Sequence, residues 1–230
     1  MALKIIPTIL TDKLSIFVEQ VEWTRARTEE VPIVQVDIID GEFAPSLTLF
    51  PDDLAGIDFG ELKIDWHLMA IEPLDYAWDI FNLENLPTRS LIAQIERMSD
   101  PRGFIEAVTS HNFKAGICLD LYTPVEEIES SWFEQGLKII QLMTVKAGAQ
   151  GQAFSPLVFE KLAELKKTYG QQIETYGVEI MIDGGVNQQT LAELLERTPL
   201  RIDATGVGSA LWRGDLAENL AGLLAVVEGD

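Results

Sequence analysis

The sequence predicts an α/β fold, a single (β/α)8 TIM barrel that forms one domain over residues 1–230. The first observation is the length, because 230 residues suit one large domain. The second is a regular alternation of short apolar runs with longer amphipathic segments. The third is that the apolar runs mostly lack polar alternation, as parallel strands buried on both faces do. An open doubly wound sheet has the same periodicity, so that alternative stays open.

Eight apolar runs rich in Ile, Leu and Val are expected to be the strands. They cover residues 4–10, 33–39, 63–68, 90–95, 115–119, 138–144, 178–182 and 201–205. Helical spacing of apolar residues appears at 14–27, 156–169, 188–196 and 215–227. Two further helix starts are indicated by a capping residue followed by proline, at Asp100-Pro101 and at Thr123-Pro124.

The composition is strongly acidic, with 17 Lys and Arg against 37 Asp and Glu and a formal net charge of -20. This balance argues against a nucleic-acid partner and disfavours anionic membranes. No apolar run reaches the roughly 18 residues of a membrane span. The one cysteine, Cys118, excludes an internal disulfide and is expected to be a small buried side chain rather than a catalytic thiol. Since the first residues also lack a signal-peptide pattern, a cytoplasmic protein is expected.

Two carboxylates lie inside apolar strands, Asp37 in the second and Asp183 at the end of the seventh. A carboxylate in such a place is costly unless it is paired, hydrogen-bonded or metal-bound. Either residue alone could equally be a loop cap or part of a buried salt bridge. Because His67 lies on the third strand, three polar groups on separate strands together favour a functional site at the carboxyl ends of the strands.

Glycines follow the seventh and eighth strands, as Gly184-Gly185 and as Gly206 and Gly208 with Ser209. Paired glycines usually mark a turn. At these two neighbouring strand ends, however, backbone N–H groups commonly bind phosphate. Such a site needs no Lys or Arg, which is consistent with an acidic chain, so a phosphorylated ligand is expected.

Five short motifs follow one another along nearly the whole chain at these strand ends. They are Val36-Asp37-Ile38-Ile39-Asp40-Gly41-Glu42-Phe43-Ala44-Pro45, Trp66-His67-Leu68-Met69 with Glu72-Pro73, Met143-Thr144-Val145 with Gly151-Gln152-Ala153-Phe154, Ile182-Asp183-Gly184-Gly185-Val186, and Gly208-Ser209. In composition and order they resemble the ribulose-phosphate 3-epimerase family, which includes the allulose-6-phosphate epimerases.

The resemblance implies an isomerase, a 3-epimerase of pentulose or hexulose phosphates, whose partner is a phosphorylated ketose. It implies that Asp37 and Asp183 remove and return the proton at C3 through an enediolate. Inverting a carbon needs an acid and a base on opposite faces, which the second and seventh strands can supply across the barrel mouth. Family members often form dimers or larger rings, so the resemblance leaves a homo-oligomer possible. The implied substrate contacts are Thr8, His67, Met69, Met143, Gly148, Gly151, Gly184, Gly185, Gly208 and Ser209, although both methionines could equally be core packing.

The resemblance also implies a divalent metal ion, Zn, Mn, Fe or Mg, held by two His and two Asp. The chain retains Asp37, His67 and Asp183, but Gln35 stands where the first His is expected. An amide oxygen ligates zinc and iron more weakly than imidazole, so we expect a weakened site that prefers Mn or Mg. The alternative is a site without metal, in which Gln35 donates its amide hydrogens to one of the carboxylates. His111, before the fifth strand, cannot replace the lost ligand.

Other departures also indicate a divergent member. They are Thr8 for a common Ser, Ile39 for a pocket Met, Gln94-Ile95-Glu96 for H-x-E, and Lys146-Ala147-Gly148 for N-P-G. A second interpretation is therefore a barrel of this family that binds a sugar phosphate through a degenerate metal site without epimerising it. A third is another phosphate-binding barrel chemistry, such as an aldolase or isomerase. Lys146 is the only strand-end lysine for a Schiff base, and its exposed loop position argues against that role.

Overall fold

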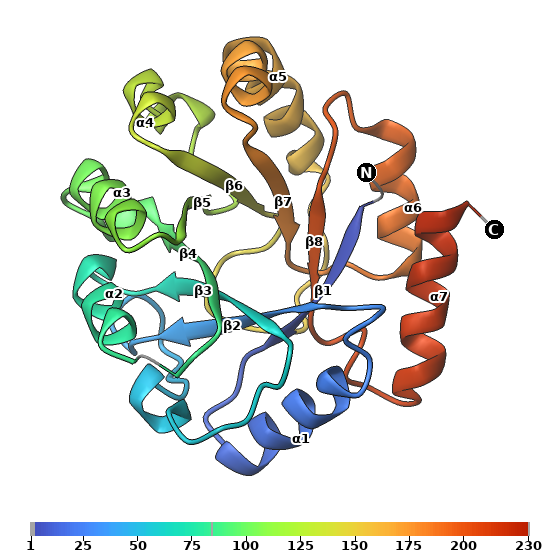
Figure 1. The fold of residues 1–230 in the computed structure, drawn as a ribbon. Helices are drawn as coiled ribbons and strands as arrows, with labels where there is room; N and C mark the ends of the chain where they lie inside the picture. Colours follow the sequence, from blue (N-terminus) through green and yellow to red (C-terminus); the bar gives the residue numbers. More distant parts are fainter. Residues whose placement is uncertain (1–2, 84, 230) are drawn as a thin grey trace.

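The protein, described by a computed structural model over residues 3–83 and 85–229, is a closed barrel of eight parallel strands (Figure 1). Each strand pairs with the next, and β8 pairs with β1 to close the ring. The open doubly wound sheet is thereby excluded. The strands are β1 (Lys4–Ile9), β2 (Ile33–Ile39), β3 (Lys63–Met69), β4 (Thr88–Gln94), β5 (Lys114–Leu119), β6 (Leu137–Met143), β7 (Glu179–Asp183) and β8 (Ala204–Val207).

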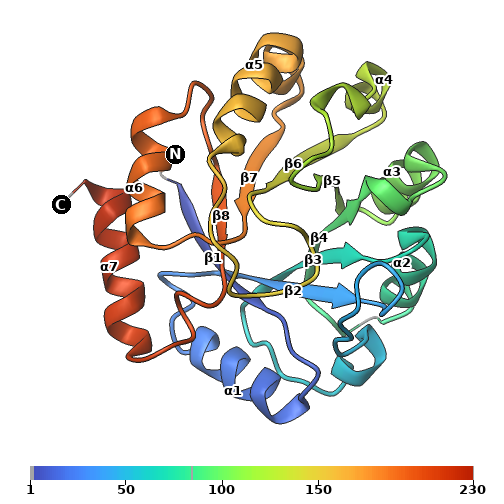
Figure 2. The same ribbon diagram turned by 180° about the vertical axis from the view of Figure 1, so that it is seen from behind.

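The helices form a ring outside the strands, which both views of the ribbon show (Figure 2). They are α1 (Leu14–Arg25), α2 (Pro73–Phe81), α3 (Pro101–Ser110), α4 (Ser130–Glu134), α5 (Leu157–Tyr176), α6 (Gln188–Arg197) and α7 (Leu216–Glu228). Short 3-10 helices η1 (Pro51–Leu54), η2 (Ile95–Arg97) and η3 (Val125–Glu127) complete the connections, and η1 replaces an α-helix between β2 and β3. Within residues 3–83 and 85–229, every helix is too short or too polar to cross a membrane.

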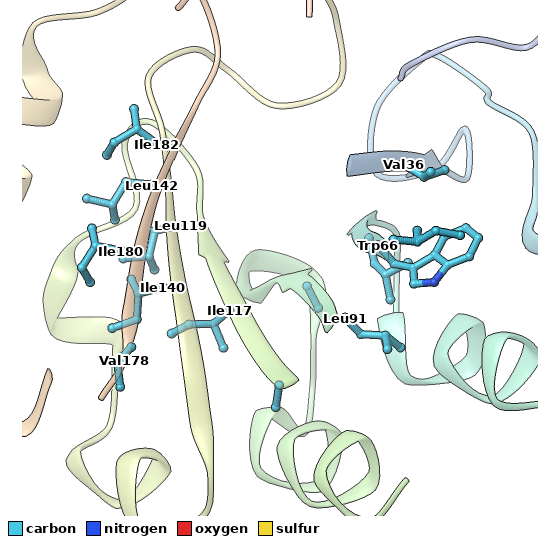
Figure 3. Close-up of a cluster of buried hydrophobic side chains, with 14 of the residues drawn as sticks. Val36, Trp66, Leu91, Ile117, Leu119, Ile140, Leu142, Val178, Ile180 and Ile182 are labelled. Carbon is cyan, nitrogen blue, oxygen red and sulfur yellow. The ribbon is translucent and has the colours of Figure 1, made fainter. Parts of the chain in front are cut away.

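The apolar core lies in two layers because successive strand residues point to opposite faces. One set, which includes Val36, Trp66 and Leu91, packs between the strands and the helices (Figure 3). The other set fills the interior of the barrel and includes Ile92 and Ile139. This two-sided burial explains why the strands appear in the sequence as nearly continuous apolar runs.

An ionic cluster fills the amino-terminal end of the barrel interior. The Arg89 guanidinium donates to both carboxylate oxygens of Asp65, at 2.6 and 2.5 Å, and to Glu179 at 2.9 Å. Ser90 donates to Asp65, and Lys114 pairs with Glu179. Since the polar groups of this end are satisfied by one another, the carboxyl ends of the strands remain the place where unpaired polar groups can meet a ligand.

The expected elements are largely confirmed, with three differences, and α2 was not expected from the sequence. The helix expected from Thr123-Pro124 is wrong: one 3-10 turn is followed by extended backbone at Ile128, whose carbonyl accepts a hydrogen bond from the hydroxyl of Tyr169, and α4 begins only at Ser130. The last strand begins three residues later than expected. The helix expected over 156–169 continues to Tyr176, where Gly177 in a left-handed conformation ends it. The helix start at Asp100-Pro101 is confirmed, since the Asp100 side chain accepts from the N–H of Gly103.

Candidate functional site

Two carboxylates and an imidazole meet inside the carboxyl end of the barrel. Asp37 on β2 lies opposite His67 in the β2–β3 register, and Asp183 ends β7. One ligand atom from each side chain lies within 4.8 Å of the others. The Nδ1 atom of His67 is 3.1 Å from Asp37 Oδ1 and 3.7 Å from Asp183 Oδ2. The structure thus brings together the three residues that the sequence indicated, from strands that lie on different sides of the barrel.

The amide nitrogen of Gln35 lies at the centre of this group. Its Nε2 atom donates to Asp37 Oδ1 at 2.9 Å and to Asp183 Oδ2 at 2.7 Å, and lies 3.4 Å from His67 Nδ1. The side chain is completely buried. The metal-free arrangement expected from the sequence had Gln35 donate to one of the two carboxylates. In the structure its amide donates to both. One neutral donor therefore offsets part of the repulsion between two buried carboxylates.

The pKa values of Asp183 and His67 are both raised in the folded protein. Burial, with the charge of Asp37, raises the pKa of Asp183 from 3.8 to about 6, although His67 and the Gln35 amide oppose the rise. Burial alone would lower the pKa of His67, but the hydrogen bond and charge of Asp37, with the charge of Asp183, raise it above 6.5. A fraction of Asp183 therefore holds a proton near neutral pH, beside a second carboxylate.

Further amides and a thiol surround the three residues. Gln94 Nε2 lies 3.1 Å from His67 Nε2 and donates to Cys118 Sγ at 3.2 Å, while Gln141 Nε2 donates to Asp183 Oδ2 at 3.2 Å. Burial raises the pKa of Cys118 well above its ordinary value, so the thiol is inert, as its apolar sequence setting indicated. Gln141 was not predicted, but its position in an apolar strand, on the same face as Met143, is the signal that could have found it.

A narrow cavity of about 50 Å³ opens above this group. Its lining includes every predicted substrate contact together with both catalytic candidates, namely Thr8, Asp37, His67, Met69, Met143, Gly148, Gly151, Asp183, Gly184, Gly185, Gly208 and Ser209. Gln35 does not line the cavity and lies beneath the carboxylates. Gly206, one of the glycines noted after the eighth strand, also lines it, whereas Leu10, Val145, Ala149, Gln150 and Gln152 line it and were not predicted as contacts.

Backbone donors face the β7 and β8 side of this cavity. In the part of the chain that the structure describes, the N–H groups of Gly185, Gly208 and Ser209 have no protein acceptor. Convergent free N–H groups are a recurrent anion site. A cation not identified from the sequence lies against the loop after β6: Nη2 of Arg213 is 3.3 Å from the position of a Cβ added to Gly151.

The valine variant Gly208→Val is expected to weaken binding of a phosphorylated ligand by tenfold or more, on the order of 1.4 kcal/mol. A Cβ at this position would lie 2.7 Å from Thr8 Oγ1, so the added side chain displaces the hydroxyl and fills the space beside the free N–H groups. Titration of inorganic phosphate followed by calorimetry measures the change. Gly56→Val, where a Cβ meets nothing within 4 Å, is the control. Equal phosphate affinity in the two variants would place the anion elsewhere.

The loop after β6 covers the cavity. Gln152 Nε2 donates to the carbonyls of Lys146 and Ala149 at 2.7 and 2.9 Å, and Ala147 N–H donates to Asp120 Oδ1 at 2.9 Å. A second cavity of about 450 Å³ lies beyond this loop and shares Gly148, Ala149 and Gln152 with the first. Lys146 is exposed and lines only the second cavity, which agrees with the argument against a Schiff base.

A closed parallel barrel with a carboxylate–imidazole–carboxylate group and free backbone N–H groups at its mouth defines a barrel enzyme for small anionic substrates. A sequence model described as the Ribulose-phosphate 3 epimerase family matches residues 4–211. The ribulose-phosphate 3-epimerase of Bacillus subtilis (strain 168) is 30% identical over 164 residues, 71% of this chain and 73% of the relative. That of Helicobacter pylori (strain J99) is 27% identical over 84% of both chains. The chain belongs to the ribulose-phosphate 3-epimerase family.

Solved structures show the same fold at lower identity. The 3-keto-L-gulonate-6-phosphate decarboxylase of Vibrio cholerae O1 biovar El Tor superposes with a TM-score of 0.70 at 10% identity, covering 100% of this chain and 99% of the other. The phosphoribosyl anthranilate isomerase of Thermus thermophilus gives 0.63 at 15% identity, covering 99% of both. At these identities the likeness extends to the barrel architecture alone.

Proposed function

We propose that this protein is an epimerase that inverts C3 of a pentulose or hexulose phosphate, with Asp37 and Asp183 as the proton-transfer pair. The observation that carries the proposal is the placement of two carboxylates from β2 and β7 beside one cavity, with the pKa of Asp183 raised to about 6. Two acids whose surroundings differ are what a reaction with one base and one acid requires. Membership of the family supports the same reaction.

In one direction of the proposed reaction, the Asp37 carboxylate removes the C3 proton and the electron pair moves toward the C2 carbonyl, giving an enediolate. Asp183 in its protonated form then delivers a proton to the opposite face of C3. The two residues exchange roles in the reverse direction. The phosphate binds the free N–H groups of Gly185, Gly208 and Ser209, which fixes C3 between the carboxylates. Met69 and Met143 line the cavity and keep water from the reacting carbon.

A divalent metal ion fits the residues present. Asp37, His67 and Asp183 supply three ligand atoms, and the buried Gln35 Oε1, which has no partner among the described residues, would be a fourth ligand atom once the amide rotates. A bound ion would offset the negative charge that develops on the substrate oxygens. With one imidazole and mostly oxygen ligands, the set favours Mn or Mg over Zn or Fe.

The test is turnover of ribulose 5-phosphate to xylulose 5-phosphate by the purified protein, with chelator and with each divalent ion added in turn. We expect epimerisation, strongest with Mn or Mg. Elemental analysis of protein purified without chelator accompanies the assay. Binding of ribulose 5-phosphate without any turnover under these conditions would instead support the second interpretation, a family barrel that binds sugar phosphate without epimerising it.

The substitution Gln35→His is expected to raise affinity for zinc about tenfold or more, because it adds an imidazole and removes the amide that bridges the carboxylates. Calorimetric titration of chelator-treated protein measures the change. Stoichiometric zinc that survives dialysis in the unsubstituted protein would contradict the weakened site. An unchanged metal content after Gln35→His would show that residue 35 is not a ligand position.

We propose a cytoplasmic location, with which the free buried thiol of Cys118 is compatible. The proposed partner is the phosphorylated ketose itself.

A further inference from the structure

We propose that Gln94 is a positioning residue that lets His67 exchange between two neutral tautomers, one that donates to Asp37 and one that is free to ligate a divalent ion. The inference rests on the metal site of the proposed function and assigns a role to a side chain that takes no part in the proton transfer. Gln94 lies on β4, is completely buried and does not line the cavity.

The two nitrogens of His67 face different partners. Nδ1 faces the carboxylates, 3.1 Å from Asp37 Oδ1, and Nε2 faces Gln94 Nε2 at 3.1 Å. An amide nitrogen only donates, so in this arrangement Nε2 carries a lone pair and the proton lies on Nδ1, where it is donated to Asp37. The hydrogen-bonded arrangement of the site therefore uses the Nδ1–H tautomer.

Metal ligation requires the other tautomer. The ligand atom that faces Asp37 and Asp183 is Nδ1, which must offer a lone pair to an ion. The proton then lies on Nε2, in a fully buried place where an N–H group needs an acceptor. A half-turn of the Gln94 amide brings Oε1 to that place. In the described residues this oxygen is buried and has no partner, so the rotation breaks no hydrogen bond that it makes.

Cys118 can pair with the Gln94 amide in either orientation. Its Sγ now accepts from Gln94 Nε2 at 3.2 Å. After the half-turn the thiol S–H can donate to Oε1, because a thiol is both a weak donor and a weak acceptor. Gln94 and Cys118 together thus serve either tautomer. Leucine at position 94 would serve neither tautomer, and glutamate, as a carboxylate, can only accept and would therefore favour the Nε2–H tautomer.

The experiment compares the wild-type protein with Gln94→Glu and Gln94→Leu, after chelator treatment, by ¹⁵N NMR of labelled histidine at about pH 9. The chain has 2 His, so His111→Asn assigns both imidazoles. We expect the Nδ1–H tautomer of His67 in the wild type, the Nε2–H tautomer in Gln94→Glu, and a change of the wild type to Nε2–H on saturation with zinc. The proposal is overturned if the metal-free wild type already holds Nε2–H, or if Gln94→Glu leaves the tautomer unchanged.

Metal affinity is the second measurement. Gln94→Leu is expected to weaken Mn binding about 10- to 100-fold, the usual effect of removing the hydrogen-bond partner of a ligating histidine. Gln20→Leu on α1 is the matched control, since its amide oxygen is also buried without a partner among the described residues but lies outside the site. Equal Mn affinity in Gln94→Leu and Gln20→Leu would also overturn the proposal. If the wild type binds no ion, the metal site of the proposed function fails, while the metal-free tautomers still decide the role of Gln94.

Discussion

Replacing Asp37 or Asp183 with asparagine is expected to lower turnover of ribulose 5-phosphate by about two to four orders of magnitude. Asparagine keeps the shape and can still accept from the Gln35 amide, but it can neither take nor deliver a proton. Because the proposed mechanism makes each residue the base in one direction of the reaction, both variants are expected to lose turnover in both directions. Steady-state assays from ribulose 5-phosphate and from xylulose 5-phosphate measure the effect.

Asp58→Asn is the control for this experiment. Asp58 is exposed, pairs with Arg25 and lies before β3, at the end of the barrel away from the cavity. Its substitution should leave turnover unchanged. Near-wild-type turnover in either site variant, with the fold intact by circular dichroism, would remove that residue from the proposed proton-transfer pair.

The same substitution at Asp183 is expected to stabilise the protein without metal by up to about 3 kcal/mol above pH 6. The difference between a folded pKa of about 6 and the ordinary 3.8 corresponds to this free energy of unfolding. Because folding raises the pKa of Asp183, the wild-type protein has its full stability below the ordinary pKa of the carboxyl group. It loses part of that stability as pH rises through the pKa of the folded state. The loss therefore falls between about pH 4 and 6, and Asp183→Asn avoids it.

Chemical unfolding in chelator, repeated from about pH 4 to 8, measures the difference between wild type and variant. The two curves should meet near pH 4 and separate as pH rises. Asp12→Asn, at an exposed carboxylate, should follow the wild type throughout. If Asp183→Asn were the less stable protein at pH 8, the Asp183 carboxylate would stabilise the fold rather than strain it. An activity that depends on a destabilising carboxylate is a familiar trade between stability and function.

The barrel was predictable because its strands bury both faces. The apolar runs at 33–39 and 115–119 stand out in the sequence, and the observed ends of most strands lie within two residues of the expected ones. The conformation of the segment after Thr123, where the expected helix is absent, was not predictable in the same way. Its capping pattern is local, but the bond from Tyr169 to the Ile128 carbonyl joins residues 41 positions apart and holds the chain extended there.

The candidate site was visible as polar residues out of place in apolar strands. Asp37, His67 and Asp183 each stand where burial is costly without a partner, and together they indicated one location. The role of Gln35 between both carboxylates was not visible, because the hydrogen bond to Asp183 joins residues 148 positions apart. Gln141 carries the same signal of a polar residue in an apolar strand, but the contacts of Gln94 with His67 and of Gln141 with Asp183 are visible only in the folded barrel.

The covering loop after β6 also determines the direction of approach to the site. A cavity of about 50 Å³ is smaller than the roughly 300 Å³ of a small-molecule pocket, so the loop must move aside for a sugar phosphate. Moving it breaks the bond from Ala147 to Asp120 and joins the small cavity to the one of about 450 Å³. That outer chamber carries Lys146 and Arg97. Glu96 and Asp120 line the same chamber, so its two cations offset two carboxylates. On the proposed function, a dianion approaching a molecule of net charge -20 thus meets a lining that is close to neutral.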